Sequence, residues 1–375
     1  MKELDLTTSY TGVRVLLRAS LNVPVEGGCV TNPYRLERAL PTIEALSARG
    51  ARVIVIGHLG EKPTDSLRPV WEAAQHLTSV PIRFIDRVIG SATTEAVAAT
   101  HDGEVIMLEN VRRDKGETAN DPTFAKALAA LGDLYVDDAF SDAHRAHASI
   151  VGIPALIPGV AGPSFMAEYT GIKPALTPPS PSLAIIGGAK FGTKEPLIRT
   201  LLQKYDHVFV GGAIADDFFK AKGYEVGRSL VSDIAPGAEL LKNSKLILPE
   251  DVVVETVDGS HEVRAIGDIA PTDTVFDVGP HSLAALAPLI AKARLILWNG
   301  PLGNFEKGYR EQTDRVARLV LEARGQSVIG GGDTIAAVNA MVTDGHKKNN
   351  FVSTAGGAML TFIAEGTLPG IEALN

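Results

Sequence analysis

Short apolar runs rich in Val, Ile and Leu alternate with longer segments of helical periodicity along the whole chain. Nearly every position in such a run is apolar, which predicts a strand buried on both faces of its sheet. Such strands separated by helices are typical of an α/β fold, a parallel sheet covered by helices. The predicted strands are 13–17, 52–56, 105–108, 134–136, 183–186, 207–210, 246–248, 274–277, 295–298 and 327–329. The predicted helices are 35–49, 66–77, 122–131 and 163–173.

The composition excludes several classes of protein. Of 375 residues 45% are hydrophobic and 21% are charged, so a largely disordered chain is excluded. No apolar run reaches the roughly 18 residues that cross a bilayer, and we expect neither a membrane location nor a secretory signal. A net charge of −8 argues against a nucleic-acid binder. The lone Cys29 favours a reducing compartment, which predicts a cytoplasmic protein.

A proline-rich stretch, 174–181, marks the best domain boundary, because it holds four prolines in eight residues. Proline removes a hydrogen-bond donor and disfavours helix in the residue before it, so we expect a stiff connector rather than a regular element. The predicted organisation is a first domain, a helix with a hinge, a second domain and a C-terminal segment. Their boundaries are 1–162, 163–181, 182–355 and 356–375.

Glycine-rich or charged segments follow five of the predicted strands. In open parallel sheets ligands bind beyond the carboxyl ends of the strands. Two domains with such loops imply a cleft between them. The segments are 58–60, 109–112, 187–190, 299–303 and 330–334.

The segments of the second half suit phosphate. Gly187 to Lys190, with Lys194, follows a strand, and glycines there let backbone N–H groups approach an anion. A tight turn with solvated lysines is the alternative. The run 330–334 suits a phosphate cradle with a Mg²⁺ carboxylate, or simply a helix cap. The run 353–358 is a third strand-to-helix anion site or cap, and Glu306 is either a ribose acceptor or a surface carboxylate.

Basic residues recur near strand ends of the first half, and their convergence would form a pocket for a small anion. Each alone is more often a solvated residue or a packed histidine. His144 and His147 lack acidic or cysteine neighbours at zinc spacing, so no metal site is expected there. A nucleotide on one domain and a small anion on the other predict a phosphoryl-transfer enzyme. The basic residues are Arg18, Arg35, His58, Arg112 and Arg145.

About ten motifs resemble the phosphoglycerate kinase family, in order and over essentially the whole chain. In the first half they are Arg18 to Pro24, Arg35, His58-Leu59-Gly60, Leu108 to Arg112, Asp138-Ala139-Phe140 and His144 to His147. In the second half they are Gly187 to Lys190 with Lys194, Asp277 to Pro280, Trp298 to Glu306, Gly330 to Thr334, Ser353 to Ala358 and Leu368-Pro369-Gly370.

The resemblance implies two Rossmann-like, doubly wound domains, with 356–375 returning to the first. It implies reversible, Mg²⁺-dependent phosphoryl transfer between 1,3-bisphosphoglycerate with ADP and 3-phosphoglycerate with ATP, in glycolysis or gluconeogenesis. It also implies hinge closure that excludes water, and a monomer.

The resemblance also implies residue roles. Arg35 and Lys190 would be catalytic, orienting the carboxylate and neutralising the transferring group. The acceptor would be held by Arg18, Ser20, Asn22, Arg35, His58, Arg112 and Arg145. The nucleotide would be held by Gly188, Lys194, Gly212, Asn299, Pro301, Glu306, Gly331, Gly332, Asp333 and Thr334, with Asp333 nearest the metal. Gly356 and Gly357 would cradle the transferred phosphate.

The chain departs from the family pattern mostly on the acceptor side. Ser20 stands where the family usually has Asp, Glu61 where it has Arg, Ser141-Asp142 where it has Gly-Thr, and Ala355 where it has Gly. Glu61 should weaken a phosphate site unless Lys62 or Arg113 supplies the charge or the side chain points outward. Two alternatives follow: a kinase of the same chemistry with another small carboxylate acceptor, and a nucleotide-binding protein without turnover.

Overall fold

Contacts within the chain divide it into two units. The computed structural model describes residues 1–189, 191–339 and 349–375. Unit 1 comprises Met1–Thr170 and Thr367–Asn375, and unit 2 comprises Gly171–Gly366. The finer boundaries given above for the domains, the hinge and the C-terminal segment remain predictions. No helix among the described residues is long and apolar enough to cross a membrane.

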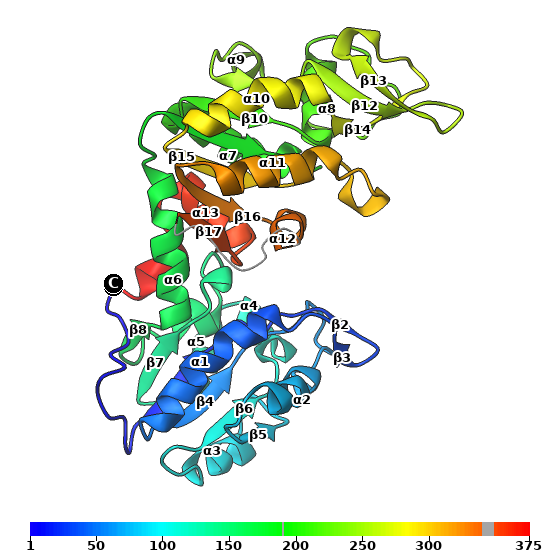
Figure 1. The fold of residues 1–375 in the computed structure, drawn as a ribbon. Helices are drawn as coiled ribbons and strands as arrows, with labels where there is room; N and C mark the ends of the chain where they lie inside the picture. The colour runs from blue at the N-terminus through cyan, green and yellow to red at the C-terminus, as the bar shows by residue number, and fades with distance from the viewer. Residues whose placement is uncertain (190, 340–348) are drawn as a thin grey trace. The chain divides into compact units, whose positions relative to one another are not determined.

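Unit 1 is built on a six-stranded sheet in which all neighbouring strands are parallel, in the order β5-β6-β4-β1-β7-β8. Figure 1 shows α1 lying along one face of this sheet. The strands are β1 (Arg14–Arg18), β4 (Arg52–Ile56), β5 (Ile82–Ile85), β6 (Val105–Leu108), β7 (Leu134–Asp137) and β8 (Gly159–Ala161). A small hairpin, β2 (Val25–Glu26) and β3 (Cys29–Val30), lies outside it.

Unit 1 contains seven helices among its described residues, of which α1 to α5 lie between its strands in the sequence. They are α1 (Tyr34–Ala48), α2 (Arg68–Leu77), α3 (Ser91–Ala98), α4 (Lys115–Thr118), α5 (Pro122–Ala129), most of α6 (Pro163–Ile172) and α14 (Pro369–Ala373). Short helical turns are η1 (Val111–Arg113), η2 (Phe140–Asp142) and η3 (Ala148–Gly152).

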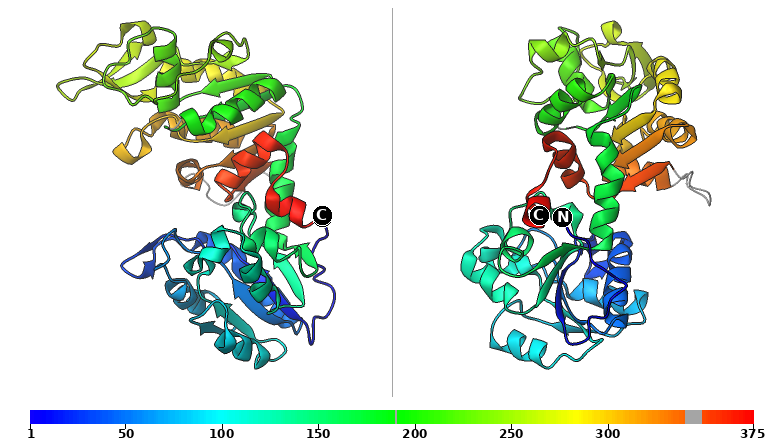
Figure 2. Two further views of the ribbon diagram at one scale, coloured as in Figure 1. Left: turned by 180° about the vertical axis from the view of Figure 1, so that it is seen from behind. Right: turned by 90° about the vertical axis from the view of Figure 1, so that its left-hand side faces the viewer.

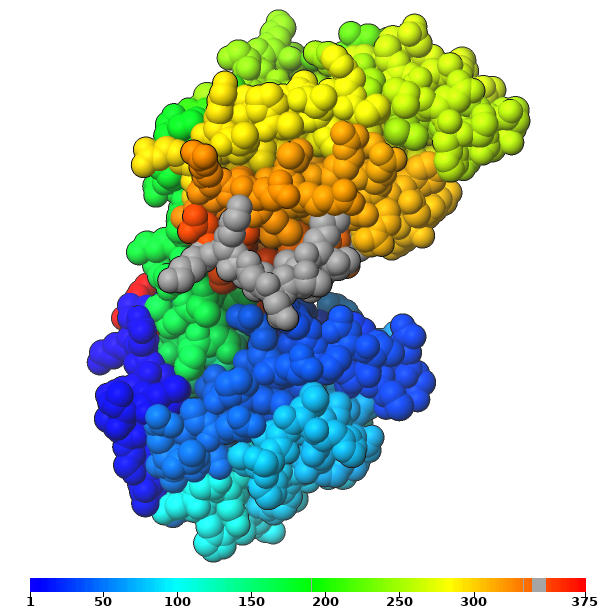
Figure 3. All heavy atoms as spheres, viewed as in Figure 1, coloured from blue at the N-terminus to red at the C-terminus, as the bar shows by residue number. Residues whose placement is uncertain are grey.

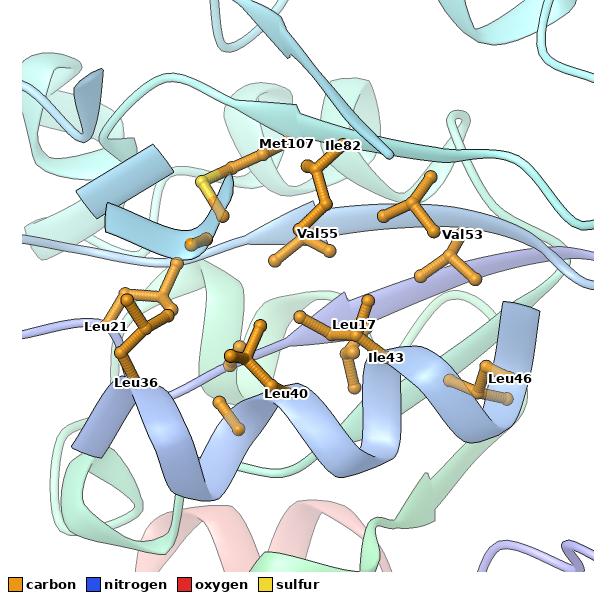
Figure 4. Packing of buried hydrophobic residues seen from close by; sticks show 14 of the residues in the cluster. Leu17, Leu21, Leu36, Leu40, Ile43, Leu46, Val53, Val55, Ile82 and Met107 are labelled. Carbon is orange, nitrogen blue, oxygen red and sulfur yellow. The ribbon is translucent and has the colours of Figure 1, made fainter. Parts of the chain in front are cut away.

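The core of unit 1 forms where α1 packs on the sheet (Figure 4). The apolar residues of α1 recur three or four apart and so share one helix face. They contact β1 and β4, whose inward side chains include Leu17, Val53 and Val55. Full burial of each such side chain stabilises the fold by about 1.5–3 kcal/mol. This packing holds the strands in place, and with them the polar residues at their ends. The packed α1 residues are Leu36, Leu40, Ile43 and Leu46.

Unit 2 repeats this plan with a second parallel sheet of six strands, in the order β11-β10-β9-β15-β16-β17. In the space-filling view α10 and α11 lie side by side on its surface, in yellow and orange (Figure 3). The strands are β9 (Ser182–Ile186), β10 (His207–Val210), β11 (Leu246–Ile247), β15 (Leu295–Asn299), β16 (Gln326–Gly330) and β17 (Asn350–Ser353). The helices are α7 (Phe191–Lys204), α8 (Ala213–Ala221), α9 (Ala238–Leu241), α10 (Pro280–Lys292), α11 (Glu311–Glu322), α12 (Gly332–Asn339) and α13 (Gly357–Glu365), with turns η5 (Ile266–Asp268) and η6 (Phe305–Lys307).

One predicted strand belongs to a different sheet. The segment 274–277 lies in β14 (Thr274–Val278), which pairs antiparallel with β12 (Asp251–Glu255) in the order β13-β12-β14. The third strand is β13 (His261–Ala265), also antiparallel to β12. The parallel-sheet prediction is therefore wrong for this segment. The first three residues of β14 are only half-buried, as expected for an antiparallel sheet with one solvated face.

The proline-rich connector is partly regular. Its first residues belong to a 3-10 helix, η4 (Lys173–Leu176), in which Pro174 takes one of the first two positions. Proline is tolerated there because the missing N–H would have no helical partner. The prediction of a connector without regular structure is therefore wrong for 174–176, and 177–181 has none.

The two chain ends lie side by side in unit 1 (Figure 2). The amino group of Met1 donates to Asn375 Oδ1 at 2.7 Å. The backbone N–H of Gly370 in α14 donates to the carbonyl of Ala143 at 2.8 Å. The C-terminal helix thereby supports the segment that follows β7.

Candidate active site

The predicted site residues lie in two groups, one at the carboxyl edge of each parallel sheet. From β1 the unit 1 chain runs outward through β4 and returns to β7 on the other side of β1. In unit 2 the same reversal separates β9 from β15. Ligands of open α/β sheets bind at such reversals. Residues on the acceptor side of the prediction follow β1, β4, β6 and β7, and those on the nucleotide side follow β9, β10, β15 and β16.

A buried carboxylate, Asp142, lies at the centre of the unit 1 group. Its Oδ2 lies 3.1 Å from Arg18 Nη2 and 3.4 Å from His58 Nδ1, and its Oδ1 lies 3.5 Å from Arg145 Nη1. Burial alone would raise the pKa of Asp142, but His58, Arg18 and Arg145 together outweigh burial and hold it well below its usual range. Three of the predicted acceptor residues thus share one internal counter-charge.

His58 lies between two arginines, Arg18 and Arg145. Burial lowers the pKa of His58, and the charges of Arg18 and Arg112 lower it further, against the opposing effect of Asp142. A neutral imidazole has one donor and one acceptor nitrogen. Arg145 Nη1 lies 3.3 Å from His58 Nε2. Arg18 Nη2 lies 3.0 Å from His58 Nδ1. Because arginine nitrogens only donate, a neutral ring can accept from only one of the two arginines.

Arg18 is buried and held by protein atoms at each nitrogen. Nε donates to Ser149 Oγ at 3.0 Å, Nη1 to the carbonyl of Ala19 at 2.7 Å, and Nη2 to Asp142. Ser149 in turn donates to Glu117 at 2.6 Å. The guanidinium group of Arg18 therefore holds the buried cluster together and does not project into solvent.

Glu61 faces the acceptor group, because its Oε1 accepts from Arg112 Nη1 at 3.1 Å. This hydrogen bond and the charge of Arg112 lower the pKa of Glu61, so the carboxylate is charged at neutral pH. Its side chain is 84% exposed, whereas that of Arg112 is 6% exposed. Arg113 pairs with Glu109 at 2.8 Å instead. The charge reversal is thus not offset by Arg113.

Asn22 connects the loop after β4 to α1. Its Oδ1 accepts from the backbone N–H of Gly60 at 3.1 Å, and its carbonyl accepts from Arg35 Nη1 at 3.0 Å. The hydroxyl groups of Ser20 and Ser141 lie 2.9 Å apart and hydrogen-bond to each other. Two of the residues that depart from the family pattern are therefore partners.

A cavity of about 330 Å³ opens beside this cluster. Arg112 and Arg145 line it, together with two residues that sequence reasoning did not assign, Lys115 and His147. Burial and the charges of Arg112 and Arg145 lower the pKa of His147 to about 4, so it is neutral at pH 7. The cavity presents three formal cations and Glu61, a composition suited to a small anion with several oxygens.

In unit 2 three backbone segments meet at the carboxyl edge. Gly187 N–H donates to the carbonyl of Asn299 at 2.9 Å, and Gly188 N–H to that of Pro301 at 3.0 Å. Gly212 has φ +63°, and a Cβ there would lie 2.8 Å from Gly188 N. Only glycine permits this approach. The predicted nucleotide residues after β9, β10 and β15 are thus brought together.

Lys194 lies one turn into α7 and donates from Nζ to the carbonyl of Gly187 at 2.5 Å. Burial lowers the pKa of Lys194 to about 8. Desolvation disfavours the ammonium form, and a bound anion would restore it. The side chain therefore lies beside the glycine-rich turn that follows β9.

The glycine run after β16 is tied to the loop after β15. Thr334 is buried, and its Oγ1 accepts from Gly300 N–H at 2.9 Å. Gly331 has φ +103° and precedes α12. Gly356 has φ +54° at the start of α13, and Ser353 Oγ accepts from Ala355 N–H at 3.1 Å. Both turns end at helix N-termini, which favour anions.

A cavity of about 730 Å³ lies in unit 2. Four predicted residues line it, and Asp216, Arg228, Phe276 and Leu302 line it as well. The other described nucleotide-side residues are not among its lining. Nothing local in the sequence marks Arg228, whereas a carboxylate among the apolar residues of α8 is a signal for Asp216. The four predicted lining residues are Gly188, Gly212, Pro301 and Glu306.

Two predicted residues fall outside the described part of the chain. They are Lys190, predicted to be catalytic, and the side chain of Asp333, predicted to contact the metal. Their roles remain predictions.

Comparison with known proteins identifies the family. The phosphoglycerate kinase family model matches residues 4–366. The chain is 42% identical to a phosphoglycerate kinase of Methylorubrum populi and 41% identical to one of Moorella thermoacetica, covering 100% of this chain and 98% of each relative.

The fold matches solved members of the same family. The phosphoglycerate kinase of Coxiella burnetii superposes with a TM-score of 0.81 at 36% identity, over 98% of this chain and 96% of that one. The Pyrococcus horikoshii enzyme superposes with a TM-score of 0.86 at 27% identity, over 100% and 98%. The two-domain α/β prediction and the resemblance are confirmed: the chain belongs to the phosphoglycerate kinase family.

Proposed function

We propose that the chain catalyses the reaction of its family, reversible transfer of a phosphoryl group between ATP and the carboxylate of 3-phosphoglycerate. The observation that supports this most directly is that the two units carry cavities of different chemical character. A small cationic cavity lies on unit 1, and a larger, mainly apolar cavity beside glycine-rich strand ends lies on unit 2. A different carboxylate acceptor is not favoured, because the family match runs over nearly the whole chain.

The acceptor site is the cationic cavity of unit 1. In this proposal Arg112 and Arg145 bind the phosphate group of 3-phosphoglycerate, and Lys115 supplies a third positive charge. Planar guanidinium groups suit phosphate and carboxylate oxygens. Arg35, held by the carbonyl of Asn22, would orient the carboxylate. Arg18 and His58 act as positioning residues in this scheme, since both are buried around Asp142.

The nucleotide site is the carboxyl edge of the unit 2 sheet. The cavity of 730 Å³ would take the base and ribose, with Glu306 as a hydroxyl acceptor. Lys194 and the N-termini of α12 and α13 would bind the phosphates, because helix N-termini and glycine-rich turns offer free N–H groups.

Transfer itself needs positioning and charge neutralisation rather than a covalent nucleophile. Arg35 and Lys190 are the proposed groups for the moving phosphoryl charge. Because acceptor and nucleotide residues belong to different units, the hinge closure predicted from the sequence remains part of the proposal.

Mg²⁺ fits the residues present as an ion carried by the nucleotide. Mg²⁺ keeps several waters and takes one or two protein carboxylates beside phosphate oxygens. Within the described ranges, His, Cys, Asp and Glu do not gather in threes to form a metal site of their own. Asp333 is the proposed carboxylate, and the ion would neutralise phosphate charge. A monomeric state and a cytoplasmic location are further parts of the proposal, the first resting on the family resemblance and the second on the lone Cys29.

The test is acyl-phosphate formation by the full chain with ATP and Mg²⁺, trapped with hydroxylamine. We compare 3-phosphoglycerate with glycerate and other small carboxylates. Hydroxamate formed efficiently with 3-phosphoglycerate alone supports the proposal. Turnover only with another acid would mean that Ser20, Glu61 and Asp142 have rebuilt the acceptor site, and ATP binding without turnover would leave a binding protein.

A further inference from the structure

The unit 2 cavity contains a buried acid to which the proposed reaction assigns no role. Asp216 lies on α8, is 1% exposed and is one of the residues that line the cavity. Neither of its carboxyl oxygens has a hydrogen-bond partner within the part of the chain that the structure describes. A buried polar group without a partner costs free energy, which a bound ligand can recover.

The surroundings of Asp216 suit an aromatic ring rather than a phosphate. Phe219 lies three residues further along α8, on the same helix face, and also lines the cavity. Val252, Val278 and Leu302 add apolar surface from other elements. The cavity is mainly apolar, although Arg228, Asp277, Glu306 and Lys307 also line it. A few polar groups in such a cavity fix the orientation of a flat ligand.

A protonated Asp216 would complement the hydrogen-bonding groups along one edge of adenine. Burial, and after it the charge of Asp217, raise the pKa of Asp216 well above its usual value, which favours the neutral acid. A neutral carboxyl group offers one O–H donor and one acceptor. The 6-amino group of adenine and the ring nitrogen beside it offer the complementary donor and acceptor.

We propose that Asp216 reads the base of the bound nucleotide, accepting a hydrogen bond from the exocyclic amino group of adenine and donating one to the adjacent ring nitrogen. The inference rests on the proposed function, because it takes the unit 2 cavity as the nucleotide site. Asp216 is thereby a specificity-determining residue and takes no part in the transfer.

The experiment compares the binding of two probes to the full chain by isothermal titration calorimetry. The probes are ADP and purine riboside 5′-diphosphate, which lacks the 6-amino group. The unmodified chain should bind ADP more tightly by roughly three- to tenfold, the ratio expected from one hydrogen bond. Asp216→Asn should keep this ratio, because an amide also offers one acceptor and a donor. Asp216→Leu should bring the ratio close to one.

A neighbouring carboxylate provides the matched control. Asp217 accepts from the backbone N–H of Ser232 at 2.6 Å and from its hydroxyl at 3.1 Å, and it does not line the cavity. Asp217→Asn should leave the ratio of the two affinities unchanged. An equal loss of the ratio in Asp217→Asn and Asp216→Leu would overturn the inference, because the effect would then come from the helix and not from a contact.

Two further outcomes separate this inference from the proposed function. If the unmodified chain binds both probes equally, Asp216 does not read the base, whether or not Asp216→Leu folds. Phosphoryl transfer to 3-phosphoglycerate could still proceed in that case. If neither probe binds while the protein is folded, the nucleotide site itself is wrong, and the inference falls together with the proposed function.

Discussion

Asp142→Asn should strongly destabilise unit 1. The substitution keeps the shape of the side chain and removes the charge that faces Arg18, His58 and Arg145. The Arg18 and Asp142 side chains are 2% and 4% exposed, so water does not replace the lost partner. Breaking a buried ion pair from one side costs about 3–5 kcal/mol, because the remaining charge stays buried.

The assay is urea unfolding followed by the fluorescence of Trp71, which lies in unit 1. Both proteins would carry Trp298→Phe, which removes the second of the two tryptophans, located in unit 2. The expected loss of 3–5 kcal/mol should appear as a lower urea midpoint with an unchanged slope.

The control is the same substitution at an exposed ion pair of the same unit. Asp133 Oδ1 lies 2.6 Å from Arg14 Nη2, with the side chains 46% and 35% exposed. An exposed pair contributes at most about 1 kcal/mol. The reasoning is refuted if Asp142→Asn costs no more than Asp133→Asn.

The pH dependence of this difference has a definite sign. The folded-state pKa of Asp142 lies well below the ordinary aspartate value of 3.8, which is the reference for the unfolded chain. Its stabilisation is therefore fully present above that reference value and is lost as pH falls toward the folded pKa. The stability gap between the unmodified chain and Asp142→Asn should shrink as the pH is lowered from 5 to 3.

Three further predictions concern activity and binding. Glu61→Gln should lower KM for 3-phosphoglycerate several-fold in steady-state kinetics, because it frees Arg112; an unchanged KM would mean that the pair does not compete with substrate. Lys190→Ala should remove most of kcat with little change in nucleotide affinity, and the opposite split would contradict its assignment to the transition state. Affinity for ATP, measured by calorimetry, should fall as pH rises through about 8, because the Lys194 ammonium is lost there. Lys194→Arg should show no such fall, and a parallel decline in both proteins would assign the effect to another group.

The strands could be predicted closely from the sequence because uniformly apolar runs are rarely anything else in an α/β chain. The strands 52–56, 105–108 and 207–210 match β4, β6 and β10 at both ends. The prediction for 274–277 was wrong for a physical reason: the apolar pattern of a strand does not indicate whether the neighbouring strand is parallel or antiparallel. Its neighbour β12 was not recognised, and pairing with it sets β14 in the antiparallel sheet.

The sequence predicts which residues gather into the two groups of the site, but it does not predict which side chains contact each other. Strand ends that share a sheet edge must bring their loops together, so the grouping followed from the fold class. The contacts that join Asp142 to Arg18 and Glu61 to Arg112 span 124 and 51 residues. No local pattern encodes such pairs, nor does one show that the Asp216 carboxyl group has no hydrogen-bond partner among the described residues.

The most direct test of the central claim is a ³¹P nuclear magnetic resonance experiment on the full chain. The unmodified protein is mixed with ATP, Mg²⁺ and 3-phosphoglycerate, and the position of the transferred group is read from the phosphorus spectrum. We expect ADP together with a new acyl-phosphate signal on the carboxylate of 3-phosphoglycerate. A phosphate ester on its hydroxyl group, or inorganic phosphate alone, would contradict the account.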